Sequence, residues 1–286
     1  MYKCKVCGSL SNIKYKKCKD INFSVSVESY DWTFCDNCES LSIVDDGINL
    51  GKYYNDYLPH KMNINYISDS HQVFIDKISE LYSKNDSFSV IDIGCGSGAL
   101  LYHIGQSFPK ATLSGTDVNV SAAKQNSALL PEVELFESEL DTLEIDRNFD
   151  VIVSSQLLEH LEDPWQFVKF IDMHSHKSTH VIIDIPNISS GSARLFGKNW
   201  IHLDTPRHRV LYTKKTIEIL FSQFTVRDYV YTGSNVSYWA SLWNLLRLSR
   251  SESFMINKVF RKSISTILDV FINPDDKVNF TLTIKR

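Results

Sequence analysis

Residues 89–101 read Ser-Val-Ile-Asp-Ile-Gly-Cys-Gly-Ser-Gly-Ala-Leu-Leu, and this stretch decides the fold. An apolar run leads into three glycines at alternate positions, Gly94, Gly96 and Gly98, and an apolar helical start follows at once. The pattern is typical of a buried parallel strand that turns tightly into a helix. Glycine accepts positive φ and has no Cβ to hold a ligand away, and the first N–H groups of the helix are unpaired. We therefore expect a ligand site here, with a plain strand-to-helix turn as the alternative.

A second acidic residue indicates the class of ligand. The glycines are spaced G-x-G-x-G, one residue tighter than the dinucleotide fingerprint, and Asp92 lies two residues before the first of them. The next expected strand, 111–116, ends at Asp117, where a carboxylate accepts hydrogen bonds from both hydroxyls of a ribose. The stretch 89–101 resembles motif I of the class I S-adenosylmethionine-dependent methyltransferases, and the two acids together favour a nucleoside cofactor.

The resemblance implies further cofactor contacts. In that family an acid just after strand three reaches the adenine amino group; Glu139 stands there, with Asp141 as a competitor. Residues 149–164, with Phe-Asp-Val-Ile at the start and Leu-Glu-His-Leu-Glu-Asp-Pro at the end, resemble one branch of the family. The backbone just after strand four is then expected to line the methionine end of the cofactor. The expected cofactor-binding residues are Asp92, Gly94, Cys95, Gly96, Gly98, Asp117, Val118, Glu139, Leu140, Ser155 and Gln156.

Strand and helix patterns alternate from residue 88 onward, which favours an α/β fold with a parallel sheet covered on both faces. We expect a Rossmann-like, seven-stranded methyltransferase sheet over residues 88–286, with a helical insertion at 236–272. In the family the last strand lies between strands five and six. Ser121 is the expected N-cap of the second helix. The expected strands are 88–93, 111–116, 133–137, 149–154, 179–185, 224–232 and 278–284, and the expected helices include 98–107, 121–130, 164–173, 213–223, 237–248 and 254–272.

Residues 1–45 carry a different signature. Two C-x-x-C pairs, Cys4 with Cys7 and Cys35 with Cys38, present four thiolates in the arrangement that tetrahedral zinc requires. We expect a small zinc ribbon, with strands at 21–27 and 30–34 and a structural Zn²⁺. Free thiols or a redox pair are the alternative. Residues 46–87 are expected to form a linker and lid helices; this stretch is rich in tyrosine, and Tyr57 is an expected substrate contact.

Composition narrows the function classes. The chain has 286 residues, a net charge of −4 and 43% hydrophobic residues, as in ordinary soluble proteins. The acidic balance argues against nucleic acid as the main partner. The N-terminus lacks the apolar core of a signal peptide, and no apolar run approaches the roughly 20 residues that span a bilayer. We therefore expect a cytoplasmic protein without disulfides.

The acceptor site is expected in the loop after strand five. Residues 189–212 combine arginines, histidines and a tryptophan at the sheet edge where open α/β sheets bind ligands. Trp200, His202 and Arg207 are the expected substrate contacts, with a well-packed cover as the alternative. His208 and His160 are the candidate bases. His174 and His176 are expected to lie on an exposed turn rather than to bind metal.

The loop resembles one in methyltransferases of surface-polysaccharide and sugar biosynthesis. The function expected from this resemblance is methyl transfer to a small acceptor, such as a nucleotide-linked sugar. An RNA methyltransferase is one alternative, because the first twenty residues are rich in lysine. A non-catalytic cofactor-binding interaction protein is the other. The apolar helices near the C-terminus suggest a cap or a homodimer face.

Overall fold

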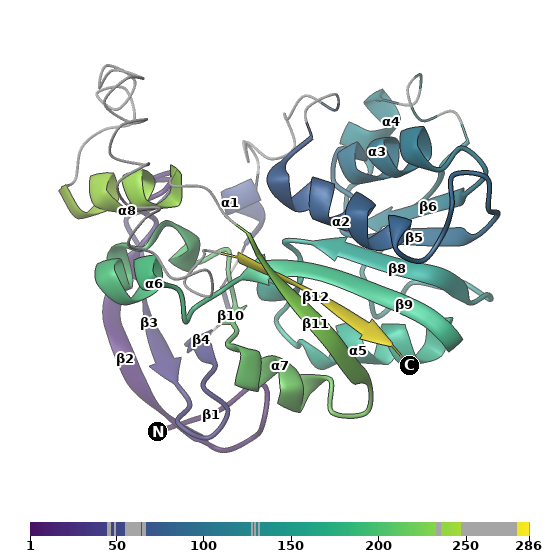
Figure 1. Ribbon diagram of the computed structural model, residues 1–286. Helices are drawn as coiled ribbons and strands as arrows, with labels where there is room; N and C mark the ends of the chain where they lie inside the picture. The colour runs from purple at the N-terminus through teal and green to yellow at the C-terminus, as the bar shows by residue number, and fades with distance from the viewer. Residues whose placement is uncertain are drawn as a thin grey trace. The chain divides into compact units, whose positions relative to one another are not determined.

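The computed structural model divides into two compact units (Figure 1). Unit 1 comprises Met1–Lys52, Pro186–Ile217 and Tyr231–Phe280, and unit 2 comprises Tyr53–Ile185, Glu218–Val230 and Thr281–Arg286. The N-terminal segment therefore shares a unit with the loop that follows strand five, whereas the sequence predicted a separate module over 1–45. The structure describes residues 1–44, 47–48, 50–54, 64, 67–126, 128, 130, 132–232, 236–246 and 279–285.

The larger sheet has seven strands in the order β11-β12-β9-β8-β5-β6-β7, which confirms the predicted fold class. The pairs β5–β6, β5–β8, β6–β7 and β8–β9 are parallel. The last strand, β12, lies between β9 and β11, as expected. The strands are β5 (Ser89–Ile93), β6 (Thr112–Asp117), β7 (Glu134–Glu137), β8 (Phe149–Ser155), β9 (Ser175–Pro186), β11 (Thr225–Thr232) and β12 (Asn279–Lys285).

Helices cover both faces of this sheet in Figure 1: α2 (Asp69–Ser79), α3 (Ala99–Ser107) and α4 (Ser121–Gln125) on one, and α5 (Trp165–His174) on the other. The central strands β5 and β8 are mainly apolar because both of their faces are covered by helices. The core between α2, α3 and the sheet includes Phe74, Leu101, Ile104 and Val151. This packing holds the carboxyl ends of β5, β6 and β8 at one edge.

Two local predictions in unit 2 are wrong. The helix expected at 121–130 ends at Gln125, and its N-cap is Val120 rather than Ser121. His174 and His176 do not lie on an exposed turn, because strand β9 already begins at Ser175. His174 is buried and its Nδ1 donates to the Arg147 carbonyl over 3.1 Å, while His176 Nε2 lies 3.1 Å from Asp150 Oδ1.

Unit 1 contains a second sheet with the order β1-β2-β3-β4-β10. The strands are β1 (Tyr2–Lys3), β2 (Leu10–Lys19), β3 (Ser29–Phe34), β4 (Leu41–Ile43) and β10 (Val210–Leu211). Antiparallel pairing of Leu211 with Leu41 and of Val210 with Ser42 adds the distant β10 to the N-terminal strands. The strand predicted at 21–27 is wrong: the partner of β3 is β2, and a turn begins at Ile21.

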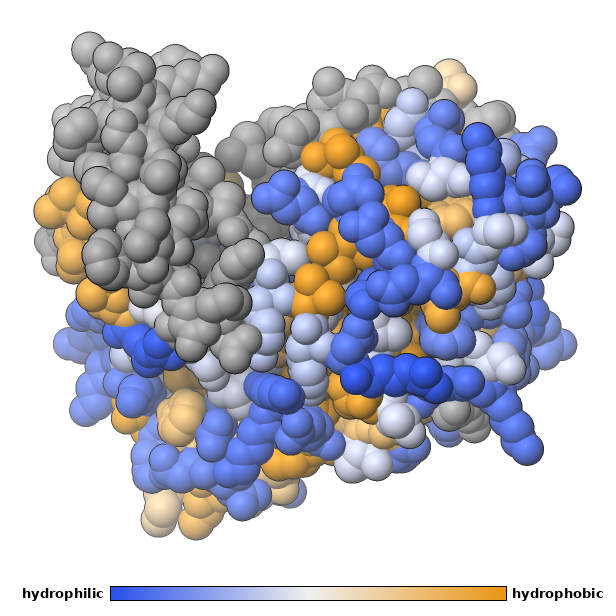
Figure 2. Space-filling model, viewed as in Figure 1, coloured by the Kyte–Doolittle hydropathy of each residue, from blue (hydrophilic) through white to orange (hydrophobic). Residues whose placement is uncertain are grey.

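The interior of unit 1 joins the N-terminal strands to later helices. Trp32 and Leu41 from the strands share one apolar cluster with Phe196, Trp200 and Tyr238. In Figure 2, apolar side chains lie at the surface on the α8 side of the view, and Leu245 and Leu246 of this helix are 49% and 56% exposed. The remaining helical elements are α1 (Gly51–Tyr54), η2 (Leu158–His160), α6 (Gly191–Phe196), η3 (Gly197–Asn199), η4 (Ile201–Leu203), α7 (Lys214–Leu220) and α8 (Val236–Leu246).

Within the described ranges, every helix is too short or too polar to cross a lipid bilayer.

Candidate functional site

The glycine turn between β5 and α3 has the conformation that its sequence predicts. Gly94, Gly96 and Gly98 have φ values of +77°, +52° and +78°, which favour glycine over residues that carry a Cβ. The backbone N–H groups of Gly94 and Cys95 donate to the Thr116 carbonyl over 2.8 and 3.0 Å. These bonds fasten the turn to the end of the neighbouring strand β6.

The three glycines have different surroundings. A Cβ on Gly94 would lie 3.0 Å from the Leu157 side chain, and one on Gly98 would lie 2.5 Å from Leu130. A Cβ on Gly96 would meet no described atom within 4 Å. Gly94 and Gly98 therefore allow the protein to pack against itself, whereas Gly96 leaves open space beside its backbone. This open space fits a cofactor that approaches the turn closely.

Asp117 lies at the tip of β6, beside the turn. Its Oδ2 accepts a hydrogen bond from the Gly96 N–H at 2.9 Å, and its Oδ1 accepts one from the Asn119 N–H at 3.0 Å. A carboxylate oxygen has two lone pairs, so both oxygens can accept a second hydrogen bond, as two ribose hydroxyls require. The next residue, Val118, is 68% exposed and offers an apolar surface for a base. The carboxylate fits the role that the sequence predicted.

Asp92 lies beneath the turn and is only 2% exposed. Burial, together with the negative charge of Asp117, raises the pKa of Asp92 to about 8, so the carboxyl group is mainly neutral at pH 7. Its Oδ1 has no hydrogen-bond partner among the described residues. Buried oxygens of this kind are uncommon, and a polar group of a bound cofactor would satisfy it.

The two candidate acids for the adenine follow β7. Glu139 and Asp141 are both exposed, and the Glu139 carbonyl accepts a hydrogen bond from the Thr142 N–H at 3.2 Å. Leu140 lies between them and is half-buried. The turn presents both carboxylates to solvent, so the choice between Glu139 and Asp141 stays open.

A buried acid that the sequence analysis missed supports the end of β8. Gln156 has a φ of +55°, which is strained for a side-chain-bearing residue. Its N–H donates to the Asp184 carbonyl at 2.8 Å, and its Nε2 donates to Asp184 Oδ2 at 2.8 Å. Thr281 Oγ1 donates to the other carboxylate oxygen at 3.1 Å. Asp184 thus holds Gln156 in place. The sequence offered one signal for this role, because Asp184 is an acid within the apolar run of strand five.

His160, a candidate base, lies on η2, four residues after Gln156. Its Nδ1 is 2.9 Å from the Tyr54 hydroxyl, and the two rings are tilted at 59° with centroids 6.1 Å apart. Leu157, the side chain that contacts Gly94, begins the same turn and accepts the His160 N–H at 2.8 Å. His160 therefore belongs to the segment that packs on the glycine turn. Tyr57 lies outside the described residues.

The expected substrate contacts in unit 1 are largely buried. Trp200 is inside the apolar cluster, with its Nε1 donating to Ser192 Oγ at 3.0 Å. The Arg207 guanidinium donates to both oxygens of Asp204 and to both oxygens of Asp20, and it lies 4.3 Å from the Phe23 ring centroid. We therefore correct the prediction that these two residues contact the acceptor: they form the interior, the well-packed alternative.

The two histidines of the same loop have separate partners. His202 is half-buried beside Trp200, and its Nε2 lies 3.0 Å from Ser237 Oγ. Burial lowers the pKa of His202 to about 4, so the ring is neutral at pH 7. His208 is buried, and its Nδ1 lies 2.7 Å from the His202 carbonyl oxygen. A carbonyl only accepts hydrogen bonds, so His208 carries a proton on Nδ1.

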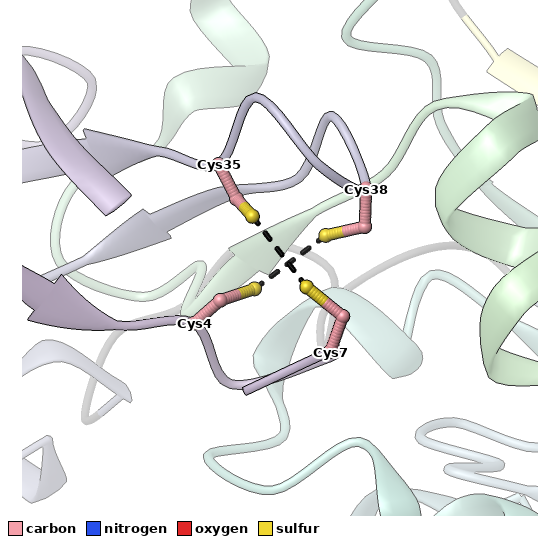
Figure 3. A group of neighbouring side chains, drawn as sticks. All are labelled: Cys4, Cys7, Cys35 and Cys38. Atoms are coloured by element: carbon pink, nitrogen blue, oxygen red, sulfur yellow. Dashed lines mark hydrogen bonds between the residues drawn. The ribbon is translucent and has the colours of Figure 1, made fainter. Parts of the chain in front are cut away.

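The four N-terminal cysteines meet at one point (Figure 3). Cys4 Sγ lies 3.5 Å from Cys38 Sγ, and Cys7 Sγ lies 3.5 Å from Cys35 Sγ, with no disulfide among them. All four sulfurs lie within 4.8 Å of one another. Sulfurs around tetrahedral zinc are about 3.8 Å apart, given Zn–S bonds of about 2.3 Å. The arrangement fits a closed structural zinc site, with an N–H of Val6 also donating to Cys4 Sγ at 3.4 Å.

Comparison with known proteins gives matches to methyltransferases. A family model described as "Methyltransferase domain" matches residues 66–225, more than half of the chain. The chain is 41% identical over 88 residues to a release factor glutamine methyltransferase of Rhodopirellula baltica, covering 28% of this chain and 30% of that protein. It is 25% identical over 121 residues to a ubiquinone biosynthesis O-methyltransferase of Rickettsia felis, covering 41% and 48%. The chain thus spans less than half the length of these curated relatives.

Solved structures agree on the fold. Coclaurine N-methyltransferase bound to N-methylheliamine and SAH has a TM-score of 0.54 at 16% identity, covering 83% of this chain and 81% of that one. A putative sarcosine dimethylglycine methyltransferase from Galdieria sulphuraria has a TM-score of 0.52 at 11% identity, covering 76% and 84%. At such identities the likeness shows the fold alone. The length of the match to the family model decides membership, and the chain belongs to the methyltransferase-domain family.

Proposed function

We propose that this protein transfers a methyl group from S-adenosylmethionine to a small-molecule acceptor. The observation that carries the proposal is the pairing of Gly96, which has open space beside its backbone, with Asp117, whose carboxylate is held at that turn by two backbone N–H groups. Membership of the methyltransferase family supports the same cofactor. When bound, the cofactor supplies an electrophilic methyl group.

The chain's own residues bind and orient. Asp117 accepts the ribose hydroxyls, and Val118 covers one face of the base. Glu139 or Asp141, with the Leu140 N–H, reads the adenine. Ser155 and Gln156 line the methionine end, where Asp184 keeps Gln156 in its strained conformation. Cys95, Gly94 and Gly98 build the turn itself. Because these residues bind and orient the cofactor, the rate of the reaction depends mainly on alignment of the acceptor with the methyl group.

We assign proton removal from the acceptor to His208. Its Nδ1–H donates to the His202 carbonyl oxygen, so Nε2 is the ring nitrogen that would receive a proton from the acceptor. A histidine with its proton fixed on one nitrogen by a carbonyl is well arranged to receive a proton on the other. The acceptor we propose is a sugar or nucleotide sugar of polysaccharide biosynthesis, with His202 among its contacts.

The remaining parts of the proposal concern the whole protein. We propose that Zn²⁺ bound by Cys4, Cys7, Cys35 and Cys38 is structural, that the protein is cytoplasmic, and that it forms a homodimer through its C-terminal helices. The exposed leucines at the end of α8 support the last point. The helix expected at 254–272 lies outside the described residues.

The test is calorimetric binding of S-adenosylmethionine together with transfer of labelled methyl groups. Asp117→Ala removes two hydrogen bonds to a charged acceptor, so we expect the Kd to rise roughly 100-fold or more. Asp146→Ala, which removes an exposed carboxylate elsewhere, is the control and should bind normally. Nucleotide sugars and RNA are offered in parallel as acceptors. Normal binding by Asp117→Ala would contradict the ribose assignment; label in RNA alone would contradict the sugar acceptor.

A further inference from the structure

Ser40 places a hydroxyl group against two buried cysteines of the N-terminal cluster shown in Figure 3. Its Oγ lies 3.2 Å from Cys4 Sγ and 3.2 Å from Cys38 Sγ, and the residue is only 1% exposed. The backbone fixes this position, because the Cys35 N–H donates to the Ser40 carbonyl at 3.0 Å and closes the turn of the second C-x-x-C pair. The hydroxyl is therefore built into the cysteine cluster.

The chemistry of a cysteine cluster gives the direction of this hydrogen bond. Cysteine binds zinc as a thiolate, which has no proton and only accepts hydrogen bonds. With the metal bound, the Ser40 O–H is thus the donor, and its hydrogen goes to Cys4 or Cys38 or is shared between them. Four thiolates exceed the charge of one Zn²⁺, so the site carries excess negative charge. Hydrogen-bond donors to the sulfurs stabilise that charge.

A second side-chain donor lies on the exposed side of the cluster. Asn37 Nδ2 is 3.5 Å from Cys7 Sγ; Asn37 is exposed and Cys7 is half-buried. If Asn37 is removed, water can donate to this sulfur in its place. Cys4 and Cys38 are 4% and 0% exposed, so water cannot replace the Ser40 hydroxyl, and a buried acceptor is left unsatisfied. Burial therefore predicts different consequences when each of the two donors is lost.

We propose that Ser40 is a positioning residue of the metal site, whose hydroxyl donates to the Cys4 and Cys38 thiolates and strengthens the binding of zinc by the cluster. Ser40 does not bind the metal, and it acts only through these two sulfurs. The role rests on the proposed zinc site and extends that site beyond its four ligands. Ser40 also links the site to β4, which begins at the next residue, Leu41.

The first experiment measures the zinc affinity of the reduced, full-length protein by competition with a coloured chelator. Ser40→Ala removes one oxygen atom, and we expect the Kd for zinc to rise roughly 10–100-fold. Asn37→Ala should change the Kd little, because water replaces the lost donor. Ser42→Ala removes another buried hydroxyl, one without a partner among the described residues, and should bind zinc as the wild type does. A wild-type Kd in Ser40→Ala would overturn the proposal.

The second experiment reads the sulfurs directly, with Co²⁺ added in place of Zn²⁺. A hydrogen bond to a thiolate lowers the energy of its lone pairs, so the loss of that bond moves the sulfur-to-cobalt charge-transfer absorption to longer wavelength. We expect this shift in Ser40→Ala and not in Ser42→Ala. Ser40→Thr keeps the hydroxyl and should restore the wild-type spectrum; if it does not fold, Ser40→Ala still decides. Weaker binding by Ser40→Ala without the shift would overturn the donor role.

The two experiments separate the possible failures. If the reduced wild-type protein binds neither Zn²⁺ nor Co²⁺, the proposed zinc site is wrong, and the role of Ser40 is overturned with it. If the wild type binds both ions and Ser40→Ala matches it in affinity and in spectrum, the zinc site stands and only the role given to Ser40 is overturned.

Discussion

At the scale of single residues, Asp92 makes stability depend on pH. Burial and the charge of Asp117 raise its pKa from 3.8 to about 8. The folded protein therefore keeps a proton that the unfolded chain releases, and the free energy of unfolding falls as pH rises between these two values. Asp92→Asn does not ionise, so its stability does not fall with pH in this way. We expect its melting temperature to exceed that of the wild type by several degrees at pH 8, and this difference to vanish near pH 4.

Asp150 is a control, because its pKa is shifted in the opposite direction to that of Asp92. Burial tends to raise its pKa, but hydrogen bonds from Ser89 and the contact with His176 outweigh burial and lower it. Its ionised form is favoured in the folded protein, so Asp150→Asn should lose stability at neutral pH and match the wild type in acid. Melting curves of cofactor-free protein check both variants. A pH-independent difference for Asp92→Asn would show that the carboxyl group is not buried as described.

At the scale of elements, Arg207 fastens the segment 186–217 to the N-terminal strands. The guanidinium is fully buried and shares its donors between Asp20 and Asp204. Asn22 adds hydrogen bonds to Asp204 and to the Ile201 carbonyl. Although burial tends to raise the pKa of Asp204, the bonds from Arg207 hold it below its ordinary value. Arg207 therefore stabilises the segment 186–217 as part of its interior.

Replacing Arg207 tests this interior role. Arg207→Met leaves two buried carboxylates without their cation, and we expect a loss of about 3–5 kcal/mol in the free energy of unfolding. Urea titration followed by the fluorescence of buried Trp32 and Trp200 measures it. Arg194→Met, on the exposed side of the same segment, should change stability by less than about 0.5 kcal/mol. Wild-type stability with a raised KM for the acceptor would instead restore Arg207 as a substrate contact.

Some elements could be predicted because the order of apolar and polar residues in the sequence reflects which positions are buried. Val90, Ile91 and Ile93 of β5 are all buried, so the strand reads as an apolar run, interrupted only by Asp92, that leads into glycine. Strand β2 gives no such signal, because most of its positions are exposed and four of its ten residues are lysine. The alternation of Phe23, Val25 and Val27 imitated a strand, yet the Asp20 carboxylate accepts the N–H groups of Phe23 and Val25 and holds a turn there.

At the scale of the whole molecule, the carboxyl edge of the seven-stranded sheet could be predicted and the construction of unit 1 could not. Gly96 lies in the turn after β5, Asp117 ends β6 and Gln156 follows β8, and parallel strands bring their carboxyl ends to one edge of the sheet. Unit 1 depends on contacts between distant segments, such as Trp32 Nε1 with Thr205 Oγ1 at 3.0 Å. A two-residue strand such as β10 has no period to detect.

The composition of unit 1 extends the expected effect of the proposed zinc site beyond the N-terminal segment. Thr216 Oγ1 donates to the Cys38 carbonyl at 2.7 Å, and β10 pairs with β4, the strand that follows the second C-x-x-C pair. In Cys35→Ser we expect loss of bound zinc. We also expect amide hydrogen exchange to become at least roughly tenfold faster over 186–217 as well as over 1–44. A tenfold faster exchange corresponds to a loss of about 1.4 kcal/mol in local stability. Strands β5 and β8 should stay protected from exchange, and cofactor affinity should change little.

The control variant is Cys18→Ser, which replaces a buried cysteine outside the cluster and should retain zinc. Faster exchange confined to residues 1–44 would show that 186–217 holds its structure independently of the metal.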